Sequence, residues 1–555
     1  MSEERENEVP LPENSSQNKS EFKHVGAVAA NSELSVKIGL EILEKGGSAA
    51  DAVIGTLLMD GICNPQSMGL GGGFLCTYYD YSTKKIECLN AREYAPIRAT
   101  PDMFDEQVPL NGGLSVCVPG EIMGYWDLHQ KYGKLDWCQV LKPAVNYCKN
   151  GIPVTRYGGS FLELMKNKIM LSPTLKEMFT KGDRLLLGTG DLMLRPNLGN
   201  TLEQIACRGP KVLYDGELTE NFVKDVQNEG GVLTIEDMKT YKTAWVDPVM
   251  SELPNDLLMH SPPQPGSGAV VQLILNVIFG TRDENDDPSV KWPRIVETWK
   301  HAFGFRCLLE GPKKHTVQKC INHMDAVCIE NIRNKIMQME KTHTDREFYS
   351  NECFSSYIGG GTCNVCVLAP NGDAVCVTSS INSAYGAMFA SRSTGIILNN
   401  HMMDFNVARD PTSKNDVEPE KQPLSSMSPS IILDKNTGLI RLIIGSAGGP
   451  KIITAISQII LDTILYKKSL QTAMDSHRLH HQLMPMKLYY EEGFPYIDIL
   501  KATGHDVEQL KSFRVRDLFI PSSSSATAIE YLNGVVGPYG DKRRDGFGGV
   551  TKIMR

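Results

Sequence analysis

A threonine that follows three glycines is the residue of this sequence whose setting most suggests chemistry. Thr362 comes directly after Gly359-Gly360-Gly361. A threonine hydroxyl is a weak nucleophile unless a base accepts its proton, but a threonine at a chain start carries its own base, because a free α-amine has a pKa of about 8. Attack of the hydroxyl on the Gly361 carbonyl, an N→O acyl shift and hydrolysis would expose that amine. Taken alone, these residues fit a flexible glycine loop entering a hairpin better than a nucleophile.

The residues after Thr362 are expected to form a β-hairpin. Residues alternate in character from Thr362 to Leu368 and again from Ala374 to Ser379. Asn371-Gly372 lies between the two runs, and an Asn-Gly pair flanked by alternating residues is a strong hairpin signal. Thr362 would therefore begin the first strand of the hairpin.

A second predicted hairpin ends in a glycine turn. Its strands run over 430–433 and 439–444, around a turn at 434–438. The second strand leads directly into Gly445-Ser-Ala-Gly-Gly449 and an apolar helix from Ile452. A strand, a glycine turn and a helix start in this order place backbone N–H groups where an anion can bind.

Helices are predicted ahead of these hairpins. Apolar residues at helical spacing follow Leu34, with Asn31 or Ser32 as N-cap, and Gly46-Gly47 ends that helix. Ser48-Ala-Ala-Asp51 resembles a capping box that opens a second helix through Leu58. Helical patterns dominate from about 155 to 350.

Length and charge limit the class of protein. A chain of 555 residues predicts one large domain or two closely packed lobes. The net charge of −8 argues against a nucleic-acid partner, since phosphate binding needs a concentrated basic surface. The 14 cysteines are too few in this length to indicate a disulfide framework, and strand cysteines such as Cys366 and Cys376 would act as small apolar residues. We expect neither a metal nor a cofactor.

The start of the sequence predicts no folded element. Residues 1–23 are acidic, polar and unpatterned, which is typical of a disordered tail. No signal peptide is visible there, and no apolar run of about 18 residues predicts a membrane span. The sequence alone therefore leaves the location of the protein unknown.

Several further motifs accompany Thr362 in a fixed order. The nucleophile strand itself reads Gly361-Thr-Cys-Asn-Val-Cys-Val-Leu368 and is followed by Thr378-Ser-Ser-Ile-Asn382. The others are Met68-Gly-Leu-Gly-Gly-Gly-Phe74, Ala91-Arg-Glu-Tyr-Ala-Pro96, Val118-Pro-Gly-Glu-Ile-Met-Gly124, Gly230-Gly-Val-Leu-Thr-Ile-Glu-Asp237, Asn399-Asn400 with Asp404-Phe405, Lys421-Gln-Pro-Leu-Ser-Ser-Met427 and Gly445-Ser-Ala-Gly-Gly449. Together they resemble the γ-glutamyltransferase family over about 24–550.

This resemblance implies an α/β fold of the N-terminal-nucleophile hydrolase type, a four-layer αββα sandwich. Cleavage before Thr362 would divide the chain into a large subunit, 24–361, and a small subunit, 362–555, which stay together as a heterodimer and form one intertwined catalytic domain. The implied activity is γ-glutamyl transfer from glutathione or another γ-glutamyl donor to water, an amino acid or a dipeptide. Relatives usually face the outside of the cell, so an extracellular or cell-surface location is favoured.

The resemblance also implies the catalytic residues. Thr362 is the nucleophile, and Ser380 occupies the position of a hydroxyl that hydrogen-bonds it. The backbone N–H groups of Gly448 and Gly449 would form the oxyanion hole. Packing of a helix against a strand would require the same two glycines.

The implied donor site holds a γ-glutamyl group by its amino acid end. Arg92 would bind the α-carboxylate with its planar guanidinium, although an ion pair with Glu93 is its structural alternative. Asp404 would pair with the α-ammonium, and Asn382 would accept a hydrogen bond from the same group. Hydroxyls for the carboxylate would come from Ser425 and Ser426, which could equally cap a loop.

Two positions depart from the family pattern. Asn364 stands where the family usually has histidine, and His401 stands where a glutamate usually meets the donor's α-ammonium. A neutral imidazole can accept that hydrogen bond, whereas a protonated one would repel the ammonium below about pH 6.5. A working enzyme with altered donor binding is expected. The alternatives are an impaired relative that binds γ-glutamyl ligands and a different acylase of the same fold.

Overall fold

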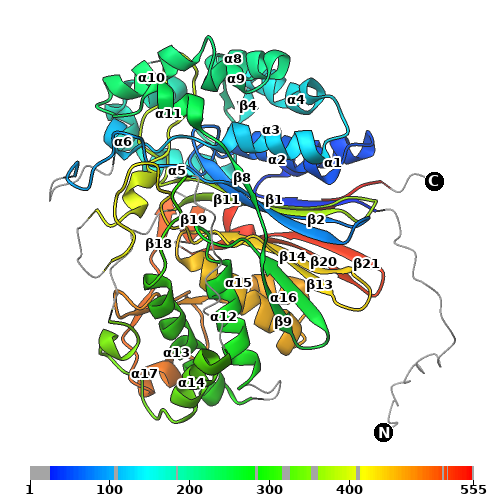
Figure 1. Ribbon diagram of the computed structural model, residues 1–555, viewed down its shortest axis with the longest axis vertical. Helices are drawn as coiled ribbons and strands as arrows, with labels where there is room; N and C mark the ends of the chain where they lie inside the picture. Colours follow the sequence, from blue (N-terminus) through cyan, green and yellow to red (C-terminus); the bar gives the residue numbers. More distant parts are fainter. Residues whose placement is uncertain are drawn as a thin grey trace, which may run out of the picture.

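Four layers make up the molecule, two β-sheets packed face to face with helices on both outer sides (Figure 1). The computed structural model describes residues 25–104, 111–182, 185–281, 286–314, 326–351, 360–407, 413–515, 518–521 and 523–552. The predicted tail, 1–23, lies outside these ranges. The αββα arrangement predicted from the family resemblance is therefore confirmed.

Thr362 lies on a central strand of the first sheet. This seven-stranded sheet has the order β22-β1-β11-β12-β2-β3-β8. Its strands are β1 (Ala27–Ala30), β2 (Gly73–Asp80), β3 (Lys85–Ala91), β8 (Ala244–Val246), β11 (Gly361–Leu368), β12 (Ala374–Asn382) and β22 (Phe547–Val550). The first predicted hairpin is confirmed as β11 and β12, which pair antiparallel from Thr362 opposite Ser380 to Leu368 opposite Ala374.

The second sheet carries the glycine turn. Its six strands have the order β21-β20-β14-β13-β10-β9. They are β9 (Val249–Leu253), β10 (Leu257–Ser261), β13 (Ser430–Asp434), β14 (Ile440–Ala447), β20 (Ser525–Leu532) and β21 (Val535–Gly540). The second predicted hairpin is confirmed as β13 and β14. Both sheets combine strands from before and after the Gly361–Thr362 bond, so neither half could complete a sheet alone.

Helices cover the outer face of each sheet (Figure 1). Those beside the first sheet include α1 (Glu33–Glu44), α2 (Ala49–Cys63), α3 (Glu121–Tyr132), α4 (Trp137–Asn150), α8 (Pro196–Arg208) and α10 (Thr219–Asn228). Those beside the second include α12 (Gly268–Phe279), α13 (Pro288–Cys307), α14 (Ala326–Met337), α15 (Lys451–Ile460), α16 (Leu470–Asp475) and α17 (Ile497–Ala502). Within the described ranges, no helix combines the length and apolar character needed to cross a bilayer.

The predicted helix starts agree with the structure. Ser32 caps α1 by accepting a hydrogen bond from the Ser35 N–H, and Ser48 and Asp51 form the capping box of α2. Helix α2 continues to Cys63 rather than ending near Leu58, because it is buried on all sides and its apolar character persists.

The region from 155 to 350 contains strands that the sequence analysis did not predict. Helices do prevail there, with α5 (Arg156–Leu164), α6 (Lys166–Leu171), α7 (Pro173–Phe179), α9 (Lys211–Tyr214) and α11 (Ile235–Thr240) in addition to those above. However, β9 and β10 complete the second sheet, and their residues alternate between buried and more exposed. Strands of five residues carry too short an alternation to stand out from helical surroundings.

The core between the sheets consists mainly of aliphatic, alanine and cysteine side chains, together with Tyr79 and Tyr531. Cys366 and Cys376 are fully buried there beside Leu368, Ile431 and Ile443. Their sulfur atoms lie 3.6 Å apart as a cross-strand pair of free cysteines. The prediction that these cysteines behave as apolar strand residues is confirmed.

Candidate active site

Thr362 is held at the start of β11, next to Ser380 on β12. Its hydroxyl oxygen lies 3.3 Å from the Ser380 hydroxyl oxygen, and the residue is 4% exposed. The strand register shifts between Gly361 and Thr362, so that Gly361 pairs with Asn382 while Thr362 pairs with Ser380. This irregularity turns the Gly361 carbonyl toward the side chains of the neighbouring strand.

The Ser380 hydroxyl contacts both Gly361 and Thr362, the two residues joined by the bond that would be cut. It donates a 2.6 Å hydrogen bond to the Gly361 carbonyl oxygen and accepts a 2.8 Å bond from the Asn382 N–H. The accepted bond orients the hydroxyl, and the donated bond polarises the carbonyl. Ser380 is therefore placed to stabilise negative charge on the Gly361 oxygen.

The glycine run before β2 makes room for this strand end. A Cβ at Gly72 would lie 2.1 Å from the Ser380 carbonyl oxygen, which no larger residue could accommodate. The glycines of the Met68–Phe74 motif therefore allow the backbone to pack closely against the strand that carries Ser380.

Arg92 and Asp404 form a direct ion pair. The Arg92 Nη2 lies 2.6 Å from Asp404 Oδ2, and the guanidinium also approaches Glu93 at 3.4 Å. Arg92 follows β3, whereas Asp404 closes the 3-10 turn His401–Asp404. The side chain of Arg92 is 1% exposed and that of Asp404 is 19% exposed, so the carboxylate is the more solvent-exposed member of the pair.

Glu93 and His401 form a second, fully buried pair behind the first. His401 Nδ1 lies 2.9 Å from Glu93 Oε1. Burial acts to raise the pKa of Glu93, but the adjacent His401 and Arg92 outweigh it and hold that pKa below the usual glutamate range. The four side chains thus lie in contact in the order Asp404, Arg92, Glu93, His401. Sequence reasoning treated Glu93 only as a structural partner of Arg92 and missed its contact with His401.

Asparagines fix the backbone that carries His401 and Asp404. Asn399 accepts hydrogen bonds from the N–H groups of Cys117 and His401, and its amide donates to the Gly71 and Cys117 carbonyls. The Asn382 amide donates to the Asn400 carbonyl at 3.1 Å, which ties the end of β12 to the same turn. Asn382 therefore lies between Ser380 and the turn that bears Asp404. The oxygen of its side-chain amide is the group that could accept a hydrogen bond from a ligand.

Ser425 and Ser426 lie on a buried loop that contacts Arg92. The Arg92 Nε donates to the Pro423 carbonyl at 3.4 Å. The Ser425 hydroxyl accepts a hydrogen bond from the Met427 N–H, so it does cap its loop. That bond uses one lone pair of the hydroxyl oxygen, so the hydroxyl proton can still be donated to a ligand. The structure therefore brings both serines onto the loop that also touches the guanidinium.

Gly448 and Gly449 connect β14 to α15 with backbone that favours glycine. Their φ angles are 127° and 61°. Arg544 lies near both the nucleophile and the start of α15, since its Nη1 donates to the Thr362 carbonyl at 3.3 Å and its charge acts on Lys451. Burial, followed by the nearby Arg544 charge, lowers the pKa of Lys451, the first residue of α15, to about 8. The helix start, Arg544 and Thr362 therefore share one electropositive region, a residue grouping that the sequence motifs did not reveal.

Asn364 performs a structural task. Its amide donates to the Thr527 hydroxyl on β20 at 2.7 Å, and it accepts a 2.7 Å bond from Thr378. Asn364 therefore bridges the two sheets, and this departure from the family pattern concerns sheet packing. In the described part of the chain, no group of three or more His, Cys, Asp or Glu side chains is placed to hold a metal ion.

Known proteins are similar to this chain over most of its length. A sequence model of the family described as Gamma-glutamyltranspeptidase matches residues 35–550. Scoloptoxin SSD14 from Scolopendra dehaani is 35% identical over 511 residues, which cover 88% of this chain and 87% of that protein. Glutathione hydrolase 5 proenzyme from Mus musculus is 36% identical over 473 residues, which cover 82% of this chain and 81% of that protein.

The fold has a solved counterpart over nearly its whole length. The crystal structure of cephalosporin acylase from Bacillus halodurans matches with a TM-score of 0.82, covering 98% of both chains at 22% identity. At that identity the likeness shows the shared fold alone, which is that of the N-terminal-nucleophile hydrolases.

Proposed function

The chain belongs to the γ-glutamyltranspeptidase family of enzymes, and we propose that it cuts its own Gly361–Thr362 bond and then transfers γ-glutamyl groups through Thr362. The observation that supports this most is the position of the Ser380 hydroxyl, which contacts both the Gly361 carbonyl oxygen and the Thr362 hydroxyl.

Self-cleavage begins with the Thr362 hydroxyl. Its oxygen attacks the carbonyl carbon of Gly361 while its proton passes to the amide nitrogen of Thr362, and Ser380 stabilises the carbonyl oxygen as it becomes negative. Collapse breaks the C–N bond and leaves an ester between Gly361 and the Thr362 hydroxyl. The Thr362 α-amine is free once this bond has broken, and water then hydrolyses the ester to give a Gly361 carboxylate and the Thr362 hydroxyl. Arg544 steadies the Thr362 carbonyl during these steps.

The donor's α-carboxylate and α-ammonium replace the contact between Arg92 and Asp404. The α-carboxylate binds the guanidinium of Arg92 and the hydroxyls of Ser425 and Ser426. The α-ammonium binds the Asp404 carboxylate and the side-chain amide oxygen of Asn382. A zwitterion can replace an ion pair without leaving an uncompensated buried charge, whereas a ligand with only one of the two charges would strand its unused partner.

Transfer then proceeds through an ester on the same threonine. The Thr362 α-amine accepts the hydroxyl proton as the oxygen attacks the donor's γ-amide carbon, and the amine returns that proton to the leaving nitrogen. The N–H groups of Gly448 and Gly449 stabilise the oxyanion, for which one donor contributes about 3–4 kcal/mol in other acyl-transfer enzymes. Water or an amine of an amino acid or dipeptide then cleaves the γ-glutamyl ester.

His401 favours a working donor site over a degenerate one. A lone imidazolium would repel the donor's ammonium, but this imidazole lies against the Glu93 carboxylate at 2.9 Å. That carboxylate offsets any positive charge on the ring. The altered residue is therefore compatible with donor binding, with Asp404 as the principal partner of the ammonium.

Release of p-nitroaniline from γ-glutamyl-p-nitroanilide tests the proposal. We expect turnover by the purified protein and none by Thr362→Ala, which should also remain a single chain. Cleaved protein that binds glutathione without turnover would instead identify the impaired relative. Cleaved protein that hydrolyses glutaryl but not γ-glutamyl anilides, without competition from free glutamate, would identify another acylase of this fold.

A further inference from the structure

A groove of about 570 Å³ lies between α7, the start of α8 and the segment 390–395. Its lining shares no residue with the site around Thr362. The volume falls within the range of about 300–1,000 Å³ that is typical of small-molecule sites. Its walls are partly polar and partly apolar, and the apolar side chains include Met178, Leu187, Leu192 and Leu194.

One end of this groove holds a buried cation without a counter-ion. Arg195 is 5% exposed, and its Nη2 donates a 2.8 Å hydrogen bond to the Gly395 carbonyl oxygen. In the described ranges no carboxylate lies within ion-pair distance of Arg195, and its buried Nε has no hydrogen-bond partner. Because arginine keeps its proton in proteins, this arrangement leaves a desolvated charge uncompensated, which is costly.

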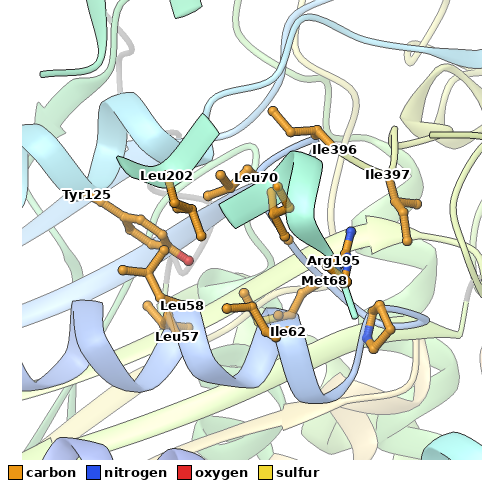
Figure 2. Close-up of a pocket in the computed structure, with 14 residues that line it drawn as sticks. Leu57, Leu58, Ile62, Met68, Leu70, Tyr125, Arg195, Leu202, Ile396 and Ile397 are labelled. Atoms are coloured by element: carbon orange, nitrogen blue, oxygen red, sulfur yellow. The ribbon is translucent and has the colours of Figure 1, made fainter. Parts of the chain in front are cut away.

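The interior side of Arg195 cannot supply the missing anion. Figure 2 shows Arg195 beside a small cavity lined by Leu57, Ile62, Met68 and other aliphatic side chains. This cavity has a volume of about 20 Å³, which is room for about one water molecule. An anion that reaches Arg195 must therefore come from the groove.

Charge and shape of the groove indicate one kind of ligand. Arg392 also lines the groove, whose single lining carboxylate is that of Glu177. Lys181 lines it too, but its ammonium lies 2.5 Å from the Asp191 carboxylate. The lining is therefore net positive through Arg195 and Arg392. None of its lining residues is aromatic, which favours a flexible aliphatic chain over a stacked ring. Leu192 and Leu194 are 62% and 56% exposed, and large apolar side chains gathered at a surface groove mark a binding site.

We propose that this groove binds an amphiphilic carboxylate, such as a medium-chain fatty acid. The carboxylate accepts hydrogen bonds from the Arg195 guanidinium, and the aliphatic chain covers Leu192 and Leu194. The proposal does not depend on self-cleavage, because Arg195 and Gly395 contact each other in the intact chain.

Equilibrium dialysis of the purified full-length protein against radiolabelled dodecanoate, below its micelle range, tests this site. We expect one saturable site for dodecanoate and no saturable binding of dodecyltrimethylammonium, which has the same chain and the opposite charge. Leu194→Glu and Arg195→Gln should each weaken dodecanoate binding by about tenfold or more, since each removes a favourable contact or adds repulsion. Activity on the γ-glutamyl anilide should be unchanged in Leu194→Glu.

Leu171→Glu is the matched control. Leu171 is an exposed leucine, 83% exposed, outside the groove lining, so its variant should bind dodecanoate like the wild type. If Arg195→Gln does not fold, Leu194→Glu decides the matter alone. The absence of saturable dodecanoate binding by the wild type, equal binding by Leu194→Glu, or equal binding of the cationic amphiphile would each overturn the proposal.

Discussion

The Ser380 hydroxyl donates a 2.6 Å hydrogen bond to the carbonyl oxygen of Gly361, the residue directly before Thr362. In the proposed self-cleavage this oxygen becomes the oxyanion, so the contact strengthens as the reaction proceeds. We therefore expect Ser380→Ala to slow the appearance of two fragments by about a hundredfold, as for other single oxyanion donors. A time course on a denaturing gel after synthesis in a cell-free system measures this rate.

Ser379→Ala is the control for this effect. Ser379 is the neighbouring buried residue of β12, and its hydroxyl donates instead to Glu121 at 2.8 Å. The loss of that bond should lower stability and leave the cleavage rate close to that of the wild type. Equal cleavage rates for Ser380→Ala and Ser379→Ala would contradict the role given to Ser380.

The Arg92–Asp404 ion pair predicts how the donor is recognised. Asp404→Asn should raise KM for γ-glutamyl-p-nitroanilide by about tenfold to a hundredfold, because a hydrogen bond to a charged group contributes about 1.5–3 kcal/mol. Inhibition by glutarate, which lacks the ammonium, should instead become stronger, because the variant no longer leaves an unpaired Asp404 carboxylate when glutarate binds Arg92. Steady-state kinetics with both compounds measure the two effects.

Asp434→Asn serves as the control for Asp404, since Asp434 caps the turn of the β13–β14 hairpin by accepting hydrogen bonds from Asn436 and Thr437. It should leave KM unchanged. An Asp404→Asn enzyme whose KM for the anilide stays at the wild-type value would show that the ammonium binds elsewhere.

The buried Glu93–His401 pair predicts a shift in acid stability. Since the Glu93 pKa is lowered in the folded protein, this group stabilises the fold above its unfolded pKa of about 4.3, and that stability is lost as the pH falls through the folded pKa. His401→Gln removes a group that lowers the Glu93 pKa. Unfolding of the variant should therefore begin at a higher pH than that of the wild type, as followed by circular dichroism.

His477→Gln provides the comparison, because His477 is an exposed histidine. Its acid unfolding should follow the wild-type curve. Coincident unfolding curves for His401→Gln and the wild type would mean that the imidazole does not lower the pKa of Glu93.

The glycine turn before α15 predicts a selective loss of turnover. At a φ of 127°, Gly448 has a conformation that alanine cannot adopt without strain, and a Cβ there would also lie 3.0 Å from the Ser524 Cα. Gly448→Ala should therefore misplace the adjacent N–H groups and lower kcat by about a hundredfold with a smaller change in KM.

Gly46→Ala separates strain from catalysis. Gly46 has a φ of 84° with no atom within 4 Å of its added Cβ, so alanine there is strained without touching the site. Its variant should lose some stability and keep its kcat. A comparable fall in kcat in both variants would remove the argument for an oxyanion hole at Gly448.

Local sequence signals predicted most of the elements that position Thr362. The Asn371-Gly372 turn, the capping box at Ser48 and the glycine turn after β14 each act through neighbouring residues, and all are confirmed. The αββα layering followed from the family resemblance instead, because no local pattern determines which strands share a sheet.

Long-range contacts could not be predicted from these local signals. Glu93 and His401 are far apart in the sequence and meet because the first sheet interleaves strands from the two halves of the chain. Arg544 reaches Thr362 from the segment that joins β21 of the second sheet to β22 of the first. The alternation in β9 and β10 was too short to distinguish them from helix. Arg195 belonged to no motif, so its lack of a counter-ion emerged only from the packed structure.

N-terminal sequencing of the purified protein tests the central claim most directly. If Thr362 cuts the bond before it, a component that begins Thr-Cys-Asn-Val will accompany the larger fragment, and Thr362→Ala will yield one intact chain. A wild-type protein that remains uncut while it turns over γ-glutamyl-p-nitroanilide, or a fragment that begins at another residue, would contradict the account.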